Sequence, residues 1–267
     1  MNFISLPDPS SIVSISDIHV RSSDDSRYQI LLSFLQDEKT KQADLIVLLG
    51  DIFDLMVGLH FEYFEWYKEF FLQLEMLLLQ NKKIVFVAGN HDFHLGKLFR
   101  FFNDNFQKKY FKKNNIIYVE LGFEVLIGGN KKIFFTHGHE LVPRKWKSIS
   151  YLSFINGHFS RLIANEFVSL ATLTKIGKFL ASKSDRHYSI FVEEQGRAAF
   201  RLWIEPILRA DYDLVVCGHS HIEDLFFNQN QQLKYANNGF SGHNSKFLYL
   251  DLNPNTKEID CELLLVK

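Results

Sequence analysis

Five short polar clusters in this chain carry side chains that can bind a metal ion. Asp17 and His19 flank a single residue in the first cluster. His219 and His221 do the same in the last one. Because side chains of an extended segment alternate between two faces, both members of each pair point the same way. The three clusters between them each supply one candidate ligand, and these are Asp51, Asn90 and His137.

Seven candidate ligands are too many for one ion and predict two ions that share a carboxylate. The predicted first site is Asp17, His19, Asp51 and His221, and the second is Asp51, Asn90, His137 and His219. Nitrogen and oxygen donors without a thiolate suit Mn²⁺, Fe, Zn²⁺ or Co²⁺. Two such ions, about 3.5–4 Å apart, make a nucleophile of water and hold phosphoryl oxygens during in-line attack. The clusters therefore predict a phosphoesterase.

His91 and Asp92 follow the candidate ligand Asn90 and are predicted to act in catalysis. His91 can donate a proton to the leaving oxygen or stabilise charge in the transition state. Asp92 or Asp54 can orient a metal-binding imidazole by accepting a hydrogen bond from its other ring nitrogen. Capping of a turn is the alternative role for either aspartate.

Each cluster follows a short apolar run, and these runs must position the ligands. They span residues 12–16, 45–49, 84–88, 133–136 and 214–217. Runs of this length that are rich in Ile, Val, Leu and Phe indicate buried strands. Residues 28–38 and 61–79 lie between the early runs and have apolar positions at helical spacing. Strands alternating with helices predict an α/β fold with parallel pairing, in which ligands bind at the carboxyl ends of strands.

The pattern changes between residues 141 and 200, which hold nine Lys or Arg against four Asp or Glu. We expect a helical insertion there, near the site and within a single domain that covers residues 1–267. Apolar runs resume at residues 225–227, 234–236, 247–252 and 259–266. They predict further strands with antiparallel pairing.

The composition of the chain limits the classes of protein to which it can belong. Hydrophobic residues make up 46% of the 267 residues, enough for a large core, and the net charge of −1 gives no argument for a nucleic-acid partner. Cys217 and Cys261 lie in apolar runs and are expected to fill strand positions, which suits a reducing compartment. We expect no signal peptide at the N-terminus. We also expect no membrane-spanning helix, because the chain lacks a run of about 18 apolar residues.

At the five clusters the chain closely resembles the calcineurin-like metallophosphoesterases. Their signature comprises Asp-x-His, Gly-Asp-x-x-Asp, Gly-Asn-His-Asp, a single His and Gly-His-x-His. The matching residues here, in the same order, are 17–19, 50–54, 89–92, 137 and 218–221. The resemblance implies a four-layer α/β/β/α sandwich and the metal ligands assigned above.

Within that superfamily the chain looks most like the UDP-2,3-diacylglucosamine pyrophosphohydrolases of lipid A biosynthesis. The similarity lies in residues 90–97, in the turn at 137–138 and in the basic insertion. It implies cleavage of the pyrophosphate of a diacylated UDP-sugar, giving UMP and a lipid monophosphate, usually with Mn²⁺. It also implies a cytoplasmic protein on the inner membrane face, with the insertion as a lid over the acyl chains. His91 and His139 depart from that subfamily, in which Arg and Asp are usual.

The insertion contains candidate contacts to lipid and substrate. Arg144, Lys145 and Lys147 are predicted to contact anionic headgroups, at about 1 kcal/mol each, and Trp146 the lipid interface. The predicted contacts to phosphate or sugar are Lys183, Ser184, Arg186 and His187. The alternative is that the aromatic residues only pack the insertion on the core and that the cations are solvated.

The same motifs also fit two other functions. A soluble phosphodiesterase or phosphatase acting on nucleotides or phosphoproteins would turn over a water-soluble substrate without detergent. A catalytically silent scaffold would have a broken ligand set, whereas all seven positions are intact here.

Overall fold

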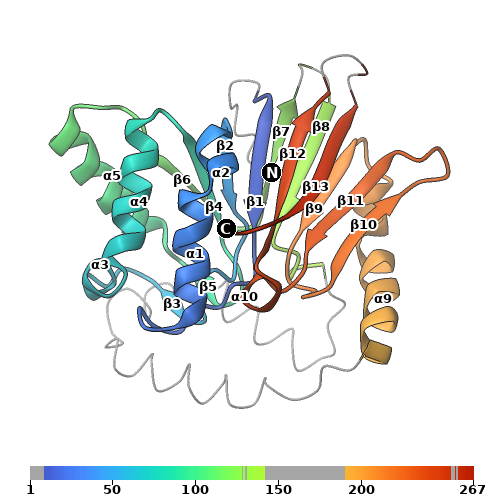
Figure 1. Cartoon of the computed structure of the whole chain (residues 1–267), viewed down its shortest axis with the longest axis horizontal. Helices are drawn as coiled ribbons and strands as arrows, with labels where there is room; N and C mark the ends of the chain where they lie inside the picture. Colours follow the sequence, from blue (N-terminus) through green and yellow to red (C-terminus); the bar gives the residue numbers. More distant parts are fainter. Residues whose placement is uncertain (1–8, 128, 130, 142–189, 254–255, 257) are drawn as a thin grey trace.

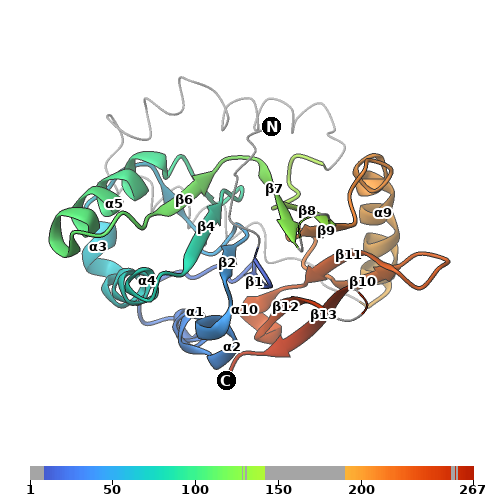
Figure 2. The same cartoon turned by 90° about the horizontal axis from the view of Figure 1, so that it is seen from above.

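The computed structural model describes residues 9–127, 129, 131–141, 190–253, 256 and 258–267. Two β-sheets lie against each other in the middle of the molecule (Figure 1), as the view from above also shows (Figure 2). Helices cover the outer face of each sheet, at the left and the right of Figure 1.

The larger sheet has six strands, in the order β13-β12-β1-β2-β4-β6. Its members are β1 (Ser11–Ile15), β2 (Leu45–Leu48), β4 (Lys83–Val87), β6 (Ile116–Val119), β12 (Lys246–Leu252) and β13 (Ile259–Leu265). β1, β2, β4 and β6 run parallel, whereas β12 and β13 join the edge in antiparallel fashion. The parallel strands end at the same edge, so they carry Asp17, Asp51 and Asn90 to one end of the sheet.

The second sheet has five strands, in the order β10-β11-β9-β8-β7. Its members are β7 (Gly122–Ile127), β8 (Lys131–Thr136), β9 (Leu214–Cys217), β10 (Glu223–Phe227) and β11 (Leu233–Asn238). β8, β9 and β11 are parallel, and the edge strands β7 and β10 are antiparallel to their neighbours. His137 follows β8 and His219 follows β9, so these ligands also lie at carboxyl ends.

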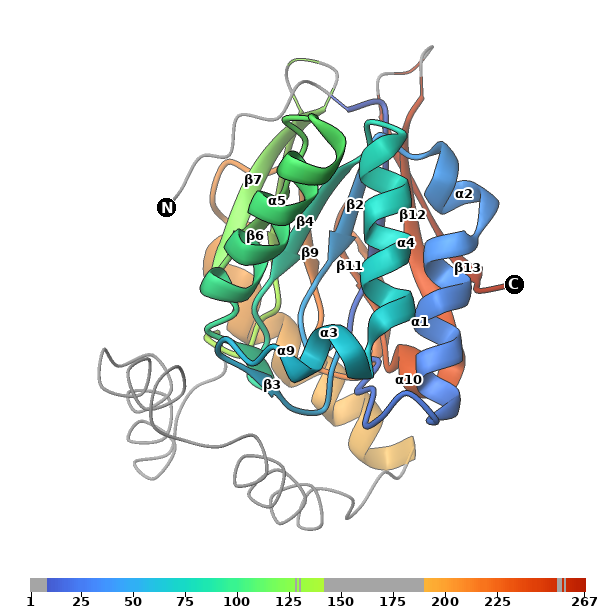
Figure 3. The same cartoon turned by 90° about the vertical axis from the view of Figure 1, so that its left-hand side faces the viewer.

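Helices from the first half of the chain cover the larger sheet, as Figure 3 shows from that side. They are α1 (Ser26–Gln36), α2 (Glu38–Gln42), α3 (Glu62–Trp66), α4 (Lys68–Leu79) and α5 (Gly96–Tyr110). The long helix α9 (Ile190–Leu208) lies beside the second sheet. A short helix, α10 (Ser241–Asn244), follows β11, and β3 (Met56–Val57) pairs with β5 (Asp92–Phe93).

Three hydrophobic clusters fill the spaces between these layers. Phe34, Phe70 and Phe99 pack the helices on the larger sheet. Val47, Val85, Phe135 and Val216 belong to the cluster between the two sheets. Phe200 and Ile204 of α9 pack on Val215 of β9. The predicted four-layer α/β/β/α sandwich is therefore confirmed.

Most predicted elements are present, but one predicted helix is broken and several short or unpatterned elements were not predicted. All five strands that precede the metal-binding clusters are present. The helix predicted over residues 61–79 is instead α3 and α4, because Tyr67 between them has φ −117° and ψ 39°. Its ring is buried against Phe53 and Tyr28, and this packing outweighs helix continuity. β11 pairs in parallel with β9 although antiparallel pairing was expected. The elements that were not predicted are α2, α5, α10, β3, β5, β6 and β7.

The predicted insertion is described only in part. Residues 142–189 lie outside the described residues. Residues 190–200 belong to α9, which continues to Leu208 and packs on the second sheet. Cys217 and Cys261 stand in β9 and β13 without a disulfide, as expected. Among the described helices, none combines the length and the hydropathy needed to span a bilayer.

Candidate metal centre

The backbone bends sharply at the predicted ligands. Positive φ angles of 51° to 64° occur at Asp17, His19, Asp51, His219 and His221. Residues other than glycine rarely adopt this left-handed conformation, because each instance costs about 1–3 kcal/mol and persists only where the surrounding structure enforces it. Its recurrence at five predicted ligands indicates that the chain turns after β1, β2 and β9 to aim these side chains inward.

The first metal group consists of Asp17, His19, Asp51 and His221. The Nε2 atoms of His19 and His221 lie 3.2 Å apart. His221 Nε2 also lies 3.3 Å from Asp17 Oδ1. Ligand atoms that each lie about 2.1 Å from one ion are about 3.0–3.4 Å from one another. These side chains therefore have the spacing of donors around a single cation.

The second metal group consists of Asp51, Asn90, His137 and His219. His137 Nδ1 donates a hydrogen bond of 2.9 Å to the Leu49 carbonyl, which leaves Nε2 for an ion. His137 Nε2 lies 3.3 Å from Asp51 Oδ2, and His219 completes a cluster with both. Asn90 Oδ1 is buried and accepts no hydrogen bond from the described residues. A buried acceptor without a donor fits a cation as its partner.

Asp51 contacts both groups through one carboxylate oxygen. Asp51 Oδ2 lies 3.7 Å from His19 Nε2 and 3.3 Å from His137 Nε2. Burial raises the pKa of Asp51, but the charges of His137 and His91 outweigh it and hold the pKa well below its usual value. The carboxylate is thus ionised and placed to bridge two cations.

The charge of the Asp51 carboxylate also shifts the pKa of His137. Burial lowers the pKa of His137, but the Asp51 carboxylate outweighs this and raises the pKa to about 10. The carboxylates of this site therefore favour positive charge beside them, whether that charge is a proton or a metal ion.

Asp92 lies behind Asp51 and binds backbone amides. It is fully buried, and its carboxylate accepts hydrogen bonds from the N–H groups of Asp51 at 2.9 Å, Ile52 at 2.6 Å, Phe53 at 3.2 Å and Gly89 at 2.9 Å. Burial, with the charge of Asp51, raises the pKa of Asp92 to about 7. These contacts match the turn-capping role rather than the orientation of an imidazole.

His91 and Asp54 line the side of the site next to the first group. His91 Nδ1 donates to the Asp54 carbonyl at 2.9 Å, and its ring centroid lies 4.8 Å from that of His19. Burial lowers the pKa of His91, but the charge of Asp51 outweighs it and raises the pKa above its usual value. Asp54 Oδ1 lies 3.5 Å from His19 Nδ1, so Asp54 is placed to orient that imidazole.

Glycines let the strand ends approach one another. A Cβ on Gly50, which has φ +82°, would lie 2.7 Å from His137 Nδ1. A Cβ on Gly89 would lie 2.1 Å from Asp51 Oδ1. Space therefore requires glycine before both Asp51 and Asn90, and at Gly50 the backbone conformation requires it as well.

A segment absent from the predicted site borders the first group. Phe240 follows β11, and its ring stacks on His221 with centroids 4.8 Å apart and planes at 14°. Arg27 lies over the ring of Phe240 at 5.0 Å, and its Nη1 donates to the His19 carbonyl at 3.2 Å. The polar residues Asn237, Asn238 and Gly239 after an apolar run carry the signal that marked the five clusters, and it could have revealed this segment.

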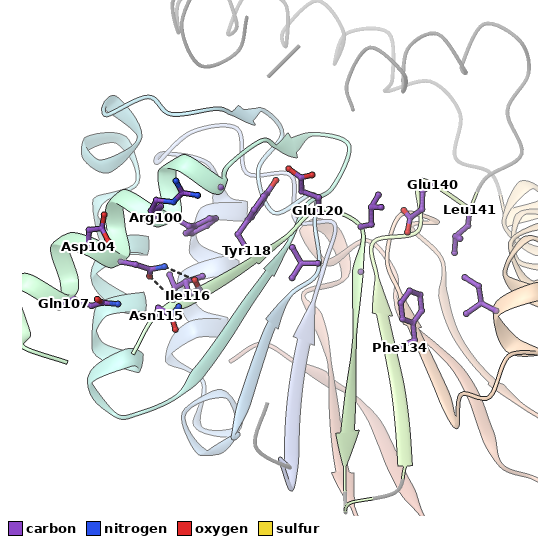
Figure 4. A pocket seen from close by; sticks show the side chains of 17 residues that line it. Arg100, Asp104, Gln107, Asn115, Ile116, Tyr118, Glu120, Phe134, Glu140 and Leu141 are labelled. Atoms are coloured by element: carbon purple, nitrogen blue, oxygen red, sulfur yellow. Dashed lines mark hydrogen bonds between the residues drawn. The ribbon is translucent and has the colours of Figure 1, made fainter. Parts of the chain in front are cut away.

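A groove of about 850 Å³ lies between α5, the β6–β7 turn and the end of β8 (Figure 4). Its wall includes Arg100, Tyr118 and Glu140, and none of the predicted metal ligands. Glu140 Oε2 lies 3.4 Å from His139 Nδ1, and the ring centroid of His139 lies 5.5 Å from that of His137. The groove therefore ends beside the second metal group.

The predicted substrate and lipid contacts in the insertion lie outside the described residues. These are Arg144, Lys145, Trp146, Lys147, Lys183, Ser184, Arg186 and His187.

Comparison with known proteins identifies the family of the chain. Residues 10–223 match the calcineurin-like phosphoesterase family. The UDP-2,3-diacylglucosamine hydrolase of Yersinia pseudotuberculosis (serotype O:1b, strain IP 31758) is 26% identical over 213 residues, which are 79% of this chain and 82% of that protein. The enzyme of the same name from Yersinia pestis gives the same values. Among solved structures, an archaeal phosphodiesterase is 17% identical, with a TM-score of 0.46 and coverage of 95% of this chain and 99% of that one. The chain belongs to the calcineurin-like phosphoesterase family and is a metal-dependent phosphoester hydrolase.

Proposed function

We propose that this hydrolase uses the two metal groups to cleave the pyrophosphate of UDP-2,3-diacylglucosamine, releasing UMP and a lipid monophosphate. The observation that carries the metal assignment is the position of Asp51 Oδ2, 3.7 Å from His19 Nε2 and 3.3 Å from His137 Nε2. Mn²⁺ is the proposed ion, and Fe, Zn²⁺ or Co²⁺ would suit the same donors.

When bound, the two ions supply Lewis-acid chemistry and lower the pKa of water. The residues of the chain then have separate roles. Asp51 would hold both cations through its carboxylate, and His137 would present Nε2 because its Nδ1 donates to the Leu49 carbonyl. His91 is placed beside the first group with its Nδ1 bonded to Asp54 O, which leaves Nε2 to act on the leaving oxygen.

Several features support the lipid substrate. The Yersinia relatives that share 26% identity over 79% of the chain are UDP-2,3-diacylglucosamine hydrolases. Residues 141–200 add a basic, aromatic segment to the metal-bearing core. We assign substrate contacts to Lys183, Ser184, Arg186 and His187, and membrane contacts to Arg144, Lys145, Trp146 and Lys147. The enzyme would then act at the cytoplasmic face of the inner membrane.

The deciding experiment compares three substrates of the Mn²⁺-loaded protein. We expect release of UMP from UDP-2,3-diacylglucosamine in detergent, and far less from the same UDP-sugar without acyl chains. The double variant Lys183→Ala/Arg186→Ala should raise KM for the lipid substrate and leave hydrolysis of bis(p-nitrophenyl) phosphate unchanged. Absence of UMP release would overturn the substrate assignment, whereas hydrolysis of the model diester would still support the metal site.

A soluble phosphodiesterase is the second candidate. It is favoured by His91, which follows the general pattern of the superfamily rather than the usual Arg of the lipid enzymes. It predicts faster turnover of a nucleotide diester without detergent than of the acylated substrate. A catalytically silent scaffold would hydrolyse neither substrate.

A further inference from the structure

We propose that Phe240 is a positioning residue that aligns both imidazoles of the first metal group, so that occupancy of the first ion depends on its aromatic ring. The inference rests on the ligand set of the proposed function. It concerns a side chain that follows β11, about 20 residues beyond the last metal motif.

One ring contacts two ligands in two different ways. Phe240 stacks face to face with His221, with centroids 4.8 Å apart and planes at 14°. It meets His19 edge-on, with centroids 5.8 Å apart and planes at 79°. Such contacts restrict the rotation of each imidazole about its side-chain bonds. With both rings held in this way, their Nε2 atoms lie 3.2 Å apart, the spacing of two donors to one ion.

The backbone on either side of Phe240 is anchored. The Phe240 carbonyl accepts hydrogen bonds from His243 N at 2.9 Å and Asn244 N at 3.0 Å, at the start of α10. Gly242 N donates to the Asp17 carbonyl at 3.1 Å. The ring is therefore presented from a segment tied directly to a third ligand of the same group.

Asn238 extends this connection to the Asp17 side chain. Asn238 is fully buried, and its Nδ2 donates to Ser241 Oγ at 2.6 Å and to the Ser16 carbonyl at 3.3 Å. The Ser16 hydroxyl lies 3.1 Å from Asn238 Oδ1 and 2.5 Å from Asp17 Oδ2. Asp17, His19 and His221 are thus all braced from residues 238–242.

The second group is held differently. His137 is fixed by the carbonyl of Leu49, which directly follows β2 of the other sheet, rather than by residues 238–242. The described ring contacts of Phe240 include His19, His221 and His243 but no ligand of the second group. Loss of the Phe240 ring should therefore weaken the binding of the first ion and leave the binding of the second unchanged.

The test is metal binding by the full-length protein after removal of metal with a chelator. Wild type titrated with Mn²⁺ should bind two ions and give the electron paramagnetic resonance spectrum of a coupled pair. For Phe240→Leu we expect the Kd of one ion to rise about 10–100-fold, the usual effect of removing a residue that orients a ligand. At Mn²⁺ concentrations between the two Kd values, the Phe240→Leu variant should bind one ion and give the six-line spectrum of uncoupled Mn²⁺. Phe240→Tyr keeps the ring and should restore the pair.

Double variants identify the ion that is lost. In the His137→Ala background, which disrupts the second group, Phe240→Leu should weaken the binding of the remaining ion. In His221→Ala, which already disrupts the first group, the same change should have little further effect. Equal effects in both backgrounds would contradict a role confined to the first group.

A matched control is Phe226→Leu, because Phe226 is also half-buried with an arginine, Arg201, over its ring at 4.7 Å. It should keep both ions. Thermal unfolding of the metal-free proteins separates lost metal from lost fold, and Phe240→Met gives a second measurement if the leucine variant does not fold. Two ions bound by Phe240→Leu with wild-type affinity would overturn the inference alone. Fewer than two ions in wild type would overturn the ligand set with it.

Discussion

The backbone N–H of His91 donates a hydrogen bond of 2.9 Å to Asp51 Oδ1, and this contact decides which oxygen of Asp51 faces the metal groups. The other oxygen, Oδ2, is left toward His19 and His137. The same turn that carries His91 therefore also orients the shared ligand. A substitution that distorts this turn should therefore weaken the binding of both ions.

Asp51→Ala should remove both ions, because the variant lacks the carboxylate that both groups share. We expect kcat/KM for bis(p-nitrophenyl) phosphate to fall at least about 100–1,000-fold, the loss typical when one preorganised charge contact is removed. Metal per chain, measured by mass spectrometry after dialysis, should fall with it. Asp211→Ala, at an exposed aspartate paired with Lys132, should change neither quantity. Two retained ions in Asp51→Ala would show that the carboxylate does not bridge.

His91→Gln should lower kcat about 10²–10⁴-fold without changing the metal content, if His91 protonates the leaving oxygen. The loss should be larger for a phenyl ester than for a p-nitrophenyl ester, because nitrophenolate leaves without help from an acid. A series of aryl phosphodiesters measures this dependence. An equal loss across the series would assign His91 to charge stabilisation instead.

Asp92→Ala should destabilise the metal-free protein. The variant leaves the four amides of Asp51, Ile52, Phe53 and Gly89 buried without their acceptor. An unsatisfied buried donor costs about 1–3 kcal/mol, so we expect a loss of at least about 3 kcal/mol in urea unfolding. Asp104→Ala on the exposed face of α5 should cost less than about 0.5 kcal/mol. A loss as small for Asp92→Ala would mean that water replaces the carboxylate.

Gly50→Ala should disrupt the second group before the first. The added Cβ meets His137 Nδ1 at 2.7 Å in a backbone with φ +82°, so the imidazole must move. We expect the Mn²⁺ affinity of one ion to fall, together with a loss of about 1–3 kcal/mol in stability. Gly96→Ala is the control, because its Cβ would meet Tyr118 at an ordinary 3.5 Å. It should be neutral or stabilise α5 by about 0.4–1 kcal/mol. Calorimetric titration and urea unfolding measure the two effects.

The sequence alone determined the metal-bearing ends of the sandwich. Short apolar runs followed by Asp, Asn, Gly or His predicted five strands, and each is present. Local information suffices there because a buried strand needs a continuous apolar run, and the ligand types reveal the chemistry at its end. The order of the motifs also identified the family, which the match over residues 10–223 confirms.

Tertiary structure decided the roles that depend on packing between distant segments. Asp92 caps the Asp51 turn rather than an imidazole, because four backbone amides converge on it from two separate loops. Tyr67 breaks a helix that its sequence pattern favoured, because its ring is buried against Phe53. Phe240 gains its position only when β11 lies beside β9, which brings its ring onto His221. Such contacts have no signature in local sequence, since a phenylalanine on a ligand and a phenylalanine in the core are the same residue until the fold places them.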